Sequence, residues 1–253
     1  MPLPPSIWGR SRAAVTPQYA VMPMEGVLES YLPGFAETTV RFLTSPAMGA
    51  RFAQCILELH PDGGTTATRN DGLEHVFYLL DGAVELTVGA DAHQLEPHGY
   101  AYVPAGMSYA IRNSGQGETR LMWIKRPYAA IEGGPTPDPI ISHRSQVEKR
   151  PDANSGRYWQ HLLGRGDMAH DMEVNILGFQ PGDYFPCVET HIQEHGLYML
   201  EGQMLYYLAG DWHEVEATDF IYMAPYCPQY CAATGWTESA YLLYKDVNRD
   251  VTF

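Results

Sequence analysis

The chain has 253 residues, of which 45% are hydrophobic and 18% are charged, a balance typical of a globular protein rather than a disordered chain or a coiled coil. Its formal net charge of −14 argues against binding to a phosphate backbone, which depends on clustered lysine and arginine. No apolar run approaches the roughly 18 residues that a membrane-spanning helix needs. We therefore expect neither nucleic acid nor a membrane among the partners of this chain.

The N-terminal segment, residues 1–45, has no counterpart elsewhere in the chain, and we expect it to form an arm or extra strands. Its start, MPLPPSIWGRSRAAVTPQYA, contains arginines but no apolar stretch behind them, so it does not predict a secretory signal. A cytoplasmic location is the resulting expectation. In that compartment we expect reduced thiols at Cys55, Cys187, Cys227 and Cys231.

An internal repeat becomes visible when the sequence is shifted against itself by 120 positions without gaps. ILELHPDGGTTATRNDGLEHVFYLLDG (56–82) then lies over ILGFQPGDYFPCVETHIQEHGLYMLEG (176–202), so that His75 meets His195. The register continues as far as Lys125, which falls on Lys245. An offset kept over about 70 residues predicts two copies of one domain.

Each copy is predicted to consist of short strands. VFYLL, Asp81-Gly82 and AVELTV predict a β-hairpin in the first copy, and the second copy offers turns at Glu201-Gly202 and at Ala209-Gly210-Asp211. Turn residues recur about every 8 to 12 positions, the spacing of a sandwich or a barrel. A segment rich in proline and glycine predicts a linker between the copies. The expected domains are 46–130 and 166–253, joined by the linker 131–165.

The segment CVETHIQEHGLYMLEG places Glu189, His191 and His195 within seven positions. In a helix the two histidines would share a face, but Glu189 would lie about 200° from His191 around the axis. A proline before this run and a glycine inside it also oppose a helix. In an extended chain Glu189 and His191 point to the same side, and His195 has the same parity. The segment therefore predicts a metal site with three ligands facing one barrel interior.

The first copy has Arg69, Asp71 and His75 at the equivalent positions. Because arginine stays protonated, it cannot ligate a cation. We therefore expect the N-terminal barrel to bind no metal and to serve as a scaffold. In the second copy, APYCPQYC offers Gln229 as a fourth ligand, at the position that the offset pairs with Tyr109.

One carboxylate, two imidazoles and an amide oxygen form a mixed oxygen and nitrogen donor set. Such a set suits Mn²⁺ or Fe²⁺ better than a metal that prefers thiolates. The neighbouring Cys227 and Cys231 would favour zinc if they were ligands, and this is the less favoured alternative.

The two copies resemble the cupin superfamily, specifically the two-domain bicupins. GYAYVPAGMSYAIRN (99–113) keeps the P-x-G of the second cupin motif, with Tyr109 near the ligand position. The resemblance covers residues 50–128 and 170–250. It implies an all-β fold of two tandem antiparallel β-barrels of the jelly-roll type, in which the N-terminal copy is degenerate.

The order Glu-x-His-x₃-His with Gln229, together with the tail AYLLYKDVNRDV (240–251), resembles the (S)-ureidoglycine aminohydrolase family of manganese bicupins. This resemblance implies a metal-dependent hydrolase that releases ammonia from (S)-ureidoglycine to give (S)-ureidoglycolate in purine and allantoin degradation. It implies Mn²⁺ as the cofactor, with other divalent metals such as Fe²⁺ as alternatives, held by Glu189, His191, His195 and Gln229.

The same resemblance implies substrate contacts from Tyr206, Tyr241 and Lys245, with Glu189 and Gln229 also contributing, and catalytic roles for Glu189 and Lys245. In an extended strand Tyr241 and Lys245 share one face. A lysine in a mostly apolar strand costs stability unless it is paired, and a substrate carboxylate would pair it. A lysine whose amine extends along the surface into water is the alternative.

Two other functional classes remain open. The first is a different metal bicupin, such as an Fe²⁺ dioxygenase, and the second is a non-catalytic bicupin that binds a small molecule or stores nitrogen. The fold does not decide between them. A ligand set that is complete in only one copy argues against storage. We expect a homo-oligomer that acts on a small-molecule substrate, because cupins often associate.

Overall fold

The computed structural model describes residues 12–251, which form β-strands and no α-helix. Three short 3₁₀ helices interrupt them: η1 (Met24–Gly26), η2 (Pro46–Met48) and η3 (Arg144–Gln146). None of these helices is long and apolar enough to cross a membrane. The first eleven residues of the expected arm lie outside the described part of the chain.

The described residues divide into two compact units. We call residues 29–150, 160–175 and 245–251 the N-terminal barrel, and residues 12–28, 151–159 and 176–244 the C-terminal barrel. Each unit is described below by itself.

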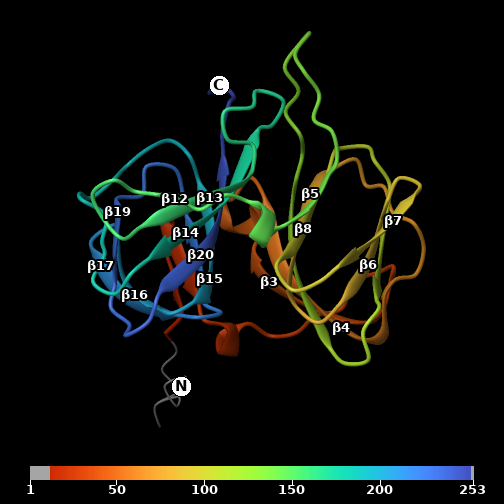
Figure 1. Cartoon of the computed structure of the whole chain (residues 1–253), viewed down its shortest axis with the longest axis horizontal. Coiled ribbons are helices and arrows are strands. Elements are labelled where there is room, and N and C mark those ends of the chain that lie inside the picture. The colour runs from red at the N-terminus through yellow and green to blue at the C-terminus, as the bar shows by residue number, and fades with distance from the viewer. Residues whose placement is uncertain (1–11, 252–253) are drawn as a thin grey trace. The chain divides into compact units, whose positions relative to one another are not determined.

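The N-terminal barrel is a single antiparallel sheet. Its strands are β3 (Phe35–Thr44), β4 (Ala53–Thr65), β5 (Glu74–Asp81), β6 (Val84–Val88), β7 (Asp91–Leu95), β8 (Gly99–Val103), β9 (Tyr109–Asn113), β10 (Thr119–Arg126) and β11 (Ile140–His143). The order across the sheet is β11-β8-β5-β10-β4-β9-β6-β7, and β3 pairs with β4 outside this path. Figure 1 shows β3 to β8 in orange to yellow-green, curving around a common interior.

The interior of the N-terminal barrel is filled by alternate residues of these strands. Leu57 and Leu59 of β4, Phe77 and Leu79 of β5, and Trp123 of β10 belong to one buried cluster. Side chains two positions apart lie on the same face of a strand, so this spacing fills one interior. Burial of each such side chain stabilises the fold by about 1.5 to 3 kcal/mol.

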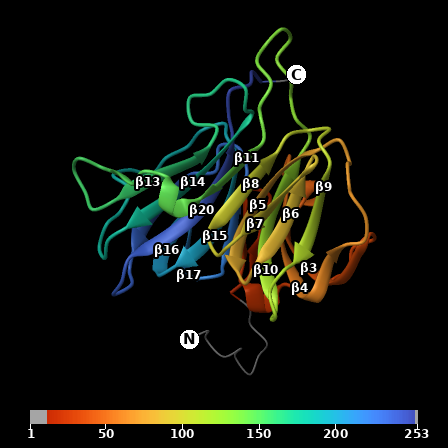
Figure 2. The same cartoon turned by 45° about the vertical axis from the view of Figure 1, so that its right-hand side comes forward.

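The C-terminal barrel draws its strands from two sheets. One has the order β1-β2-β18-β15-β20-β14-β13-β12, and the other has the order β17-β16-β19. The strands are β1 (Ala14–Val15), β2 (Tyr19–Met22), β12 (Arg150–Pro151), β13 (Tyr158–Leu163), β14 (Met172–Phe179), β15 (His195–Glu201), β16 (Gln203–Leu208), β17 (Asp211–Glu216), β18 (Phe220–Met223), β19 (Gln229–Ala233) and β20 (Ser239–Asp246). Four of them, β12, β13, β14 and β20, also include residues assigned to the N-terminal barrel. Figure 2 shows β16 and β17 side by side, in agreement with their antiparallel pairing.

Part of the expected arm joins the sheet of the C-terminal barrel. β2 pairs antiparallel with β18, and Val21 lies opposite Ile221. Both side chains are buried in the interior cluster of this barrel. The strand is thus an integral part of the wall and contributes to the core.

After β5 the chain passes to another part of the sheet, where a hairpin between β5 and β6 was expected. β5 pairs with β8 and β10, whereas β6 pairs with β7 and β9, so the hairpin predicted at Asp81-Gly82 is wrong. The equivalent Gly202 has a φ of +81°, and a Cβ there would lie 2.3 Å from the Ser239 hydroxyl oxygen. The crossing therefore needs glycine. The turn predicted at Ala209-Gly210 is confirmed, because Leu208 pairs directly with Asp211.

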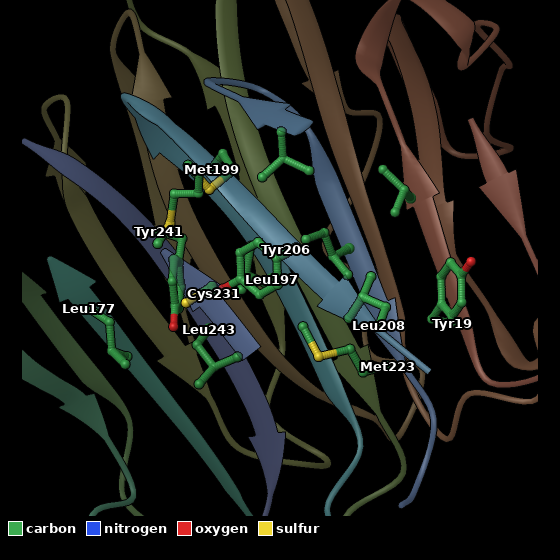
Figure 3. Packing of buried hydrophobic residues seen from close by; sticks show 14 of the residues in the cluster. Tyr19, Leu177, Leu197, Met199, Tyr206, Leu208, Met223, Cys231, Tyr241 and Leu243 are labelled. Carbon is green, nitrogen blue, oxygen red and sulfur yellow. The ribbon is translucent and has the colours of Figure 1, made fainter. Parts of the chain in front are cut away.

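The interior of the C-terminal barrel is also apolar. Its cluster includes Leu197 and Met199 of β15, Tyr206 of β16, and Tyr241 and Leu243 of β20. Figure 3 shows these side chains packed against one another between the strands. Three tyrosines (Tyr19, Tyr206 and Tyr241) and two cysteines (Cys227 and Cys231) bring polar atoms into this interior.

Candidate metal centre

A backbone bridge fixes two of the four predicted ligands. The Glu189 N–H donates to the Gln229 carbonyl at 2.8 Å, and the Gln229 N–H donates to the Glu189 carbonyl at 2.9 Å. The first copy has the same bridge at the positions 120 earlier, between Arg69 and Tyr109. The two copies therefore share a backbone frame, and they differ in the side chains that this frame carries.

The two histidines meet next to this bridge. His191 lies in the loop before β15, and His195 is the first residue of that strand. This stretch contains no helix, in agreement with the argument from the spacing. Their Nε2 atoms are 3.2 Å apart, and the rings are stacked with centroids 4.7 Å apart.

The hydrogen bonds of His191 show which of its nitrogens is free to bind a cation. Its Nδ1 lies 3.1 Å from the Gln193 carbonyl, which can only accept, so Nδ1 carries the proton. Nε2 therefore holds a lone pair, the tautomer of a histidine that ligates a metal through Nε2. The Gln229 side-chain amide lies 2.9 Å from that same Nε2. The His195 Nε2 and the Gln229 side-chain amide thus both lie next to the His191 Nε2.

This arrangement fits a metal ion. Two nitrogens that are each about 2.1 Å from one cation are about 3.0 Å apart at a right angle and about 3.4 Å apart at a tetrahedral angle. The observed 3.2 Å between the imidazole nitrogens lies between these values. The nitrogen and oxygen of an amide exchange places by a half-turn of the group, so Gln229 can present its oxygen instead.

The Glu189 carboxylate does not complete such a cluster on its own. Within residues 12–251, no group of three or more His, Cys, Asp or Glu side chains is placed to hold a metal. The structure thus brings together the side chains of His191, His195 and Gln229, and it places Glu189 beside them through the backbone.

Tyr206, Tyr241 and Cys231 lie close together in the interior of the same barrel. Tyr206 and Tyr241 are each 2% exposed, and their ring centroids are 6.3 Å apart. Figure 3 shows Cys231 beside them. Burial raises the pKa of the Tyr241 and Tyr206 hydroxyls well above the usual value, and the negative charge of Glu189 raises that of Tyr241 further. Both tyrosines therefore stay protonated at neutral pH and can donate hydrogen bonds.

Comparisons with known proteins identify the family of this chain. A family model described as a cupin domain matches residues 55–125. The chain is 36% identical to the “Probable (S)-ureidoglycine aminohydrolase” of Oryza sativa subsp. japonica, over 97% of this chain and 76% of that protein. It is 32% identical to the (S)-ureidoglycine aminohydrolase of Arabidopsis thaliana, over 97% of this chain and 78% of that protein.

The chain belongs to the (S)-ureidoglycine aminohydrolase family. The crystal structure of protein Ylba from E. coli superimposes with a TM-score of 0.86 at 29% identity, over 96% of this chain and 97% of that one. The predicted family and the predicted all-β bicupin fold are confirmed. Cupin enzymes often hold a metal ion, as the donor set described above would allow.

In the first copy, protein side chains occupy the place that corresponds to the candidate metal centre of the second copy. His75 Nε2 lies 3.0 Å from an Asp71 carboxylate oxygen, and Trp123 Nε1 donates to His75 Nδ1 at 3.0 Å. The Tyr109 ring packs against His75 with centroids 4.6 Å apart, and the Arg69 guanidinium lies over Phe35. Both nitrogens of His75 are therefore already engaged within the protein.

Lys245, a predicted substrate contact, has a partner within the protein, Glu173, that the sequence did not predict. Its Nζ lies 3.3 Å from an oxygen of Glu173. The repeat could have indicated this partner. The 120-residue offset pairs Glu173 with Ala53, and Ala53 lies opposite Lys125 where β4 pairs with β10. The same ladder position in the second copy joins Glu173 to Lys245.

Proposed function

We propose that this chain is a metal-dependent hydrolase that releases ammonia from (S)-ureidoglycine and gives (S)-ureidoglycolate. The observation that carries the proposal is the convergence of His191, His195 and Gln229 in the C-terminal barrel of a chain from this family. In the reaction a carbon–nitrogen bond breaks, the nitrogen leaves as ammonia, and water supplies the new hydroxyl group.

The donor set supports Mn²⁺ as the cation, with Fe²⁺ as the alternative. Glu189, His191, His195 and Gln229 would hold it, since together they supply carboxylate oxygen, imidazole nitrogen and amide oxygen. A divalent cation in this place supplies Lewis-acid stabilisation of the charge that develops while ammonia leaves and water adds.

The protein groups around this centre have separable roles in the proposal. A Glu189 carboxylate oxygen accepts and returns the proton that moves between water and the departing nitrogen. Gln229 is neutral and has no such capacity, so it binds and orients. The hydroxyls of Tyr206 and Tyr241 donate hydrogen bonds to polar atoms of the substrate, inside an apolar interior that excludes water. The Lys245 amine pairs with the substrate carboxylate.

The test supplies freshly generated (S)-ureidoglycine to purified, Mn²⁺-loaded protein. We expect ammonia release and a product of the S configuration, and we expect both to disappear in the His191→Ala variant. The same assay without oxygen separates the hydrolase from a dioxygenase, because hydrolysis does not consume O₂. Full metal loading without turnover would instead indicate a bicupin that only binds a small molecule.

A further inference from the structure

Lys245 is held by a carboxylate on the neighbouring strand. Lys245 lies on β20 and Glu173 on β14, which are adjacent in the sheet. The Lys245 amine is 3.3 Å from Glu173 Oε2, and the two side chains are 24% and 4% exposed. The carboxylate is therefore the buried member of the pair, and the amine is the member that solvent can reach.

The first copy provides an internal comparison. Lys125 occupies the equivalent position and lies opposite Ala53, which has no charge. Its amine instead sits over the Trp123 ring, 4.0 Å from the ring centroid. Leu243 stands in place of this tryptophan in the second copy, and Glu173 stands in place of the alanine. The lysine at this position of the repeat is thus held over an aromatic ring in the first copy and beside a carboxylate in the second copy.

The Glu173 carboxylate is itself held from several sides. The Asn175 side-chain amide donates to Glu173 Oε1 at 2.8 Å. Arg165 and His161 place nitrogens 3.5 and 3.8 Å from the same oxygen. Because Oε1 is engaged by these groups, Oε2 is left to face Lys245. A buried carboxylate with this many partners has little freedom to move.

We propose that Glu173 is a positioning residue that fixes the Lys245 amine for binding a substrate carboxylate. This inference rests on the proposed function, in which Lys245 makes that contact. An ammonium group has three donors, so one bond to Glu173 leaves two for a ligand. Fixing the amine before the ligand arrives reduces the side-chain entropy lost on binding.

The test replaces the carboxylate by its uncharged isostere, Glu173→Gln, which keeps an oxygen for Asn175. We expect KM for (S)-ureidoglycine to rise about tenfold while kcat changes less than about twofold. The reason is that a Lys245 amine held beside the substrate carboxylate contributes to substrate binding and not to bond cleavage. Glu173→Asp, which keeps the charge, should recover part of the loss. Glu148→Gln is the matched control, since it neutralises a glutamate whose side chain is 75% exposed, and it should change neither constant.

A double variant separates positioning from general stability. In a Lys245→Met background, Glu173→Gln should raise KM no further, because the group that it positions is absent. An unchanged KM in folded Glu173→Gln protein would overturn the inference, and so would additive effects in the double variant. If Glu173→Gln fails to fold, Glu173→Asp and the Lys245→Met comparison still decide.

Calorimetric binding of (S)-ureidoglycolate distinguishes this inference from the proposed function. Binding that weakens about tenfold in Glu173→Gln, in a protein that releases no ammonia, would support the positioning role and reject the hydrolase. Ammonia release with a KM that Lys245→Met leaves unchanged would do the opposite. Absence of binding by the unaltered protein would reject the positioning role.

Discussion

Glu189 and Gln229 occupy two sides of one backbone bridge, yet only one of them can carry a proton. A carboxylate both ligates a cation and exchanges protons, whereas an amide oxygen can only ligate. The division of labour proposed for the centre depends on this difference. It can be probed by making the two side chains alike.

Glu189→Gln should leave a ligand oxygen in place and remove the proton carrier. We expect the rate of ammonia release to fall at least about 100-fold, with part of the metal retained, because general acid–base catalysis contributes factors of this size. Turnover and metal content per chain are the two measurements. Glu201→Gln, at an exposed glutamate of the same barrel, should change neither. Undiminished turnover in Glu189→Gln would reject the proton-transfer role.

His75, the counterpart of His195, predicts a pH dependence of stability. Burial lowers its pKa from 6.5 to about 4, although Asp71 opposes the shift. The unfolded chain therefore binds more protons between these pH values, so the contribution of neutral His75 is present above pH 6.5 and is lost as the pH falls to about 4.

His75→Phe removes this titration. Between pH 7 and pH 5, the free energy of unfolding of the unaltered protein should fall by up to about 2 kcal/mol more than that of the variant. Urea unfolding at a series of pH values measures the difference. Parallel pH profiles for the two proteins would show that His75 is already protonated near its ordinary pKa in the folded chain.

At the residue scale, the sequence predicted that His191, His195 and Gln229 would lie together, but not every partner of the predicted site residues. Glu189, His191 and His195 could be found because their two-residue parity and the repeat both refer to local chain geometry. The partner of Lys245 could not be found in the same way. Glu173 lies 72 positions earlier, and only the order of the strands brings β14 beside β20.

Among the elements, β2 is one of the strands within residues 1–45, where an arm or extra strands were expected, and it belongs to the sheet of the C-terminal barrel. Val21 is 1% exposed within the interior cluster, whereas Val15 on the adjacent β1 is 65% exposed. Val21→Ala should lower the free energy of unfolding by about 2 kcal/mol, because it removes buried methyl groups and leaves a cavity. Val15→Ala should change it by less than about 0.5 kcal/mol. Equal effects in urea unfolding would show that β2 does not belong to the core.

Turn chemistry predicted one connection correctly and another wrongly, for a physical reason. Asp-Gly and Ala-Gly-Asp both supply the positive φ that a tight reversal needs. At Ala209-Gly210 the chain does reverse, and β16 pairs with β17. At Gly82 the positive φ instead lets the chain pass from β5 to a distant part of the sheet, because β5 and β6 have other partners. Local sequence specifies the backbone conformation of a turn but not the strand that the next segment meets.

On the scale of the whole molecule, the 120-residue offset holds in space as well as in sequence. β10 and β20 span Thr119–Arg126 and Ser239–Asp246, and β9 and β19 begin at Tyr109 and Gln229. The repeat therefore predicted the paired architecture. The assignment of metal to only one copy rests on side chains and stays a prediction.

The metal content of the purified protein tests that assignment. We expect one Mn²⁺ per chain, none in His195→Ala, and one in His75→Asn, since only the second copy offers a complete donor set. Elemental analysis after exhaustive dialysis provides the count. Two ions per chain, or a loss of metal in folded His75→Asn, would assign a metal to the first copy as well.

The pairing of β2 with β18 has a consequence for the order of folding. Val21 finds Ile221 only after 200 further residues have been added to the chain. Strand pairings of such long range are slow, because the intervening loop must be closed before the contact is gained. During synthesis, residues 29–150 can therefore fold before β18 is made, while the edge of β2 that pairs with β18 is still unpaired. Of the two larger sheets, the one that contains β2 and β18 is completed last, because the nine-stranded sheet ends with β11 at His143. Its unpaired edge is therefore exposed to misfolding during synthesis.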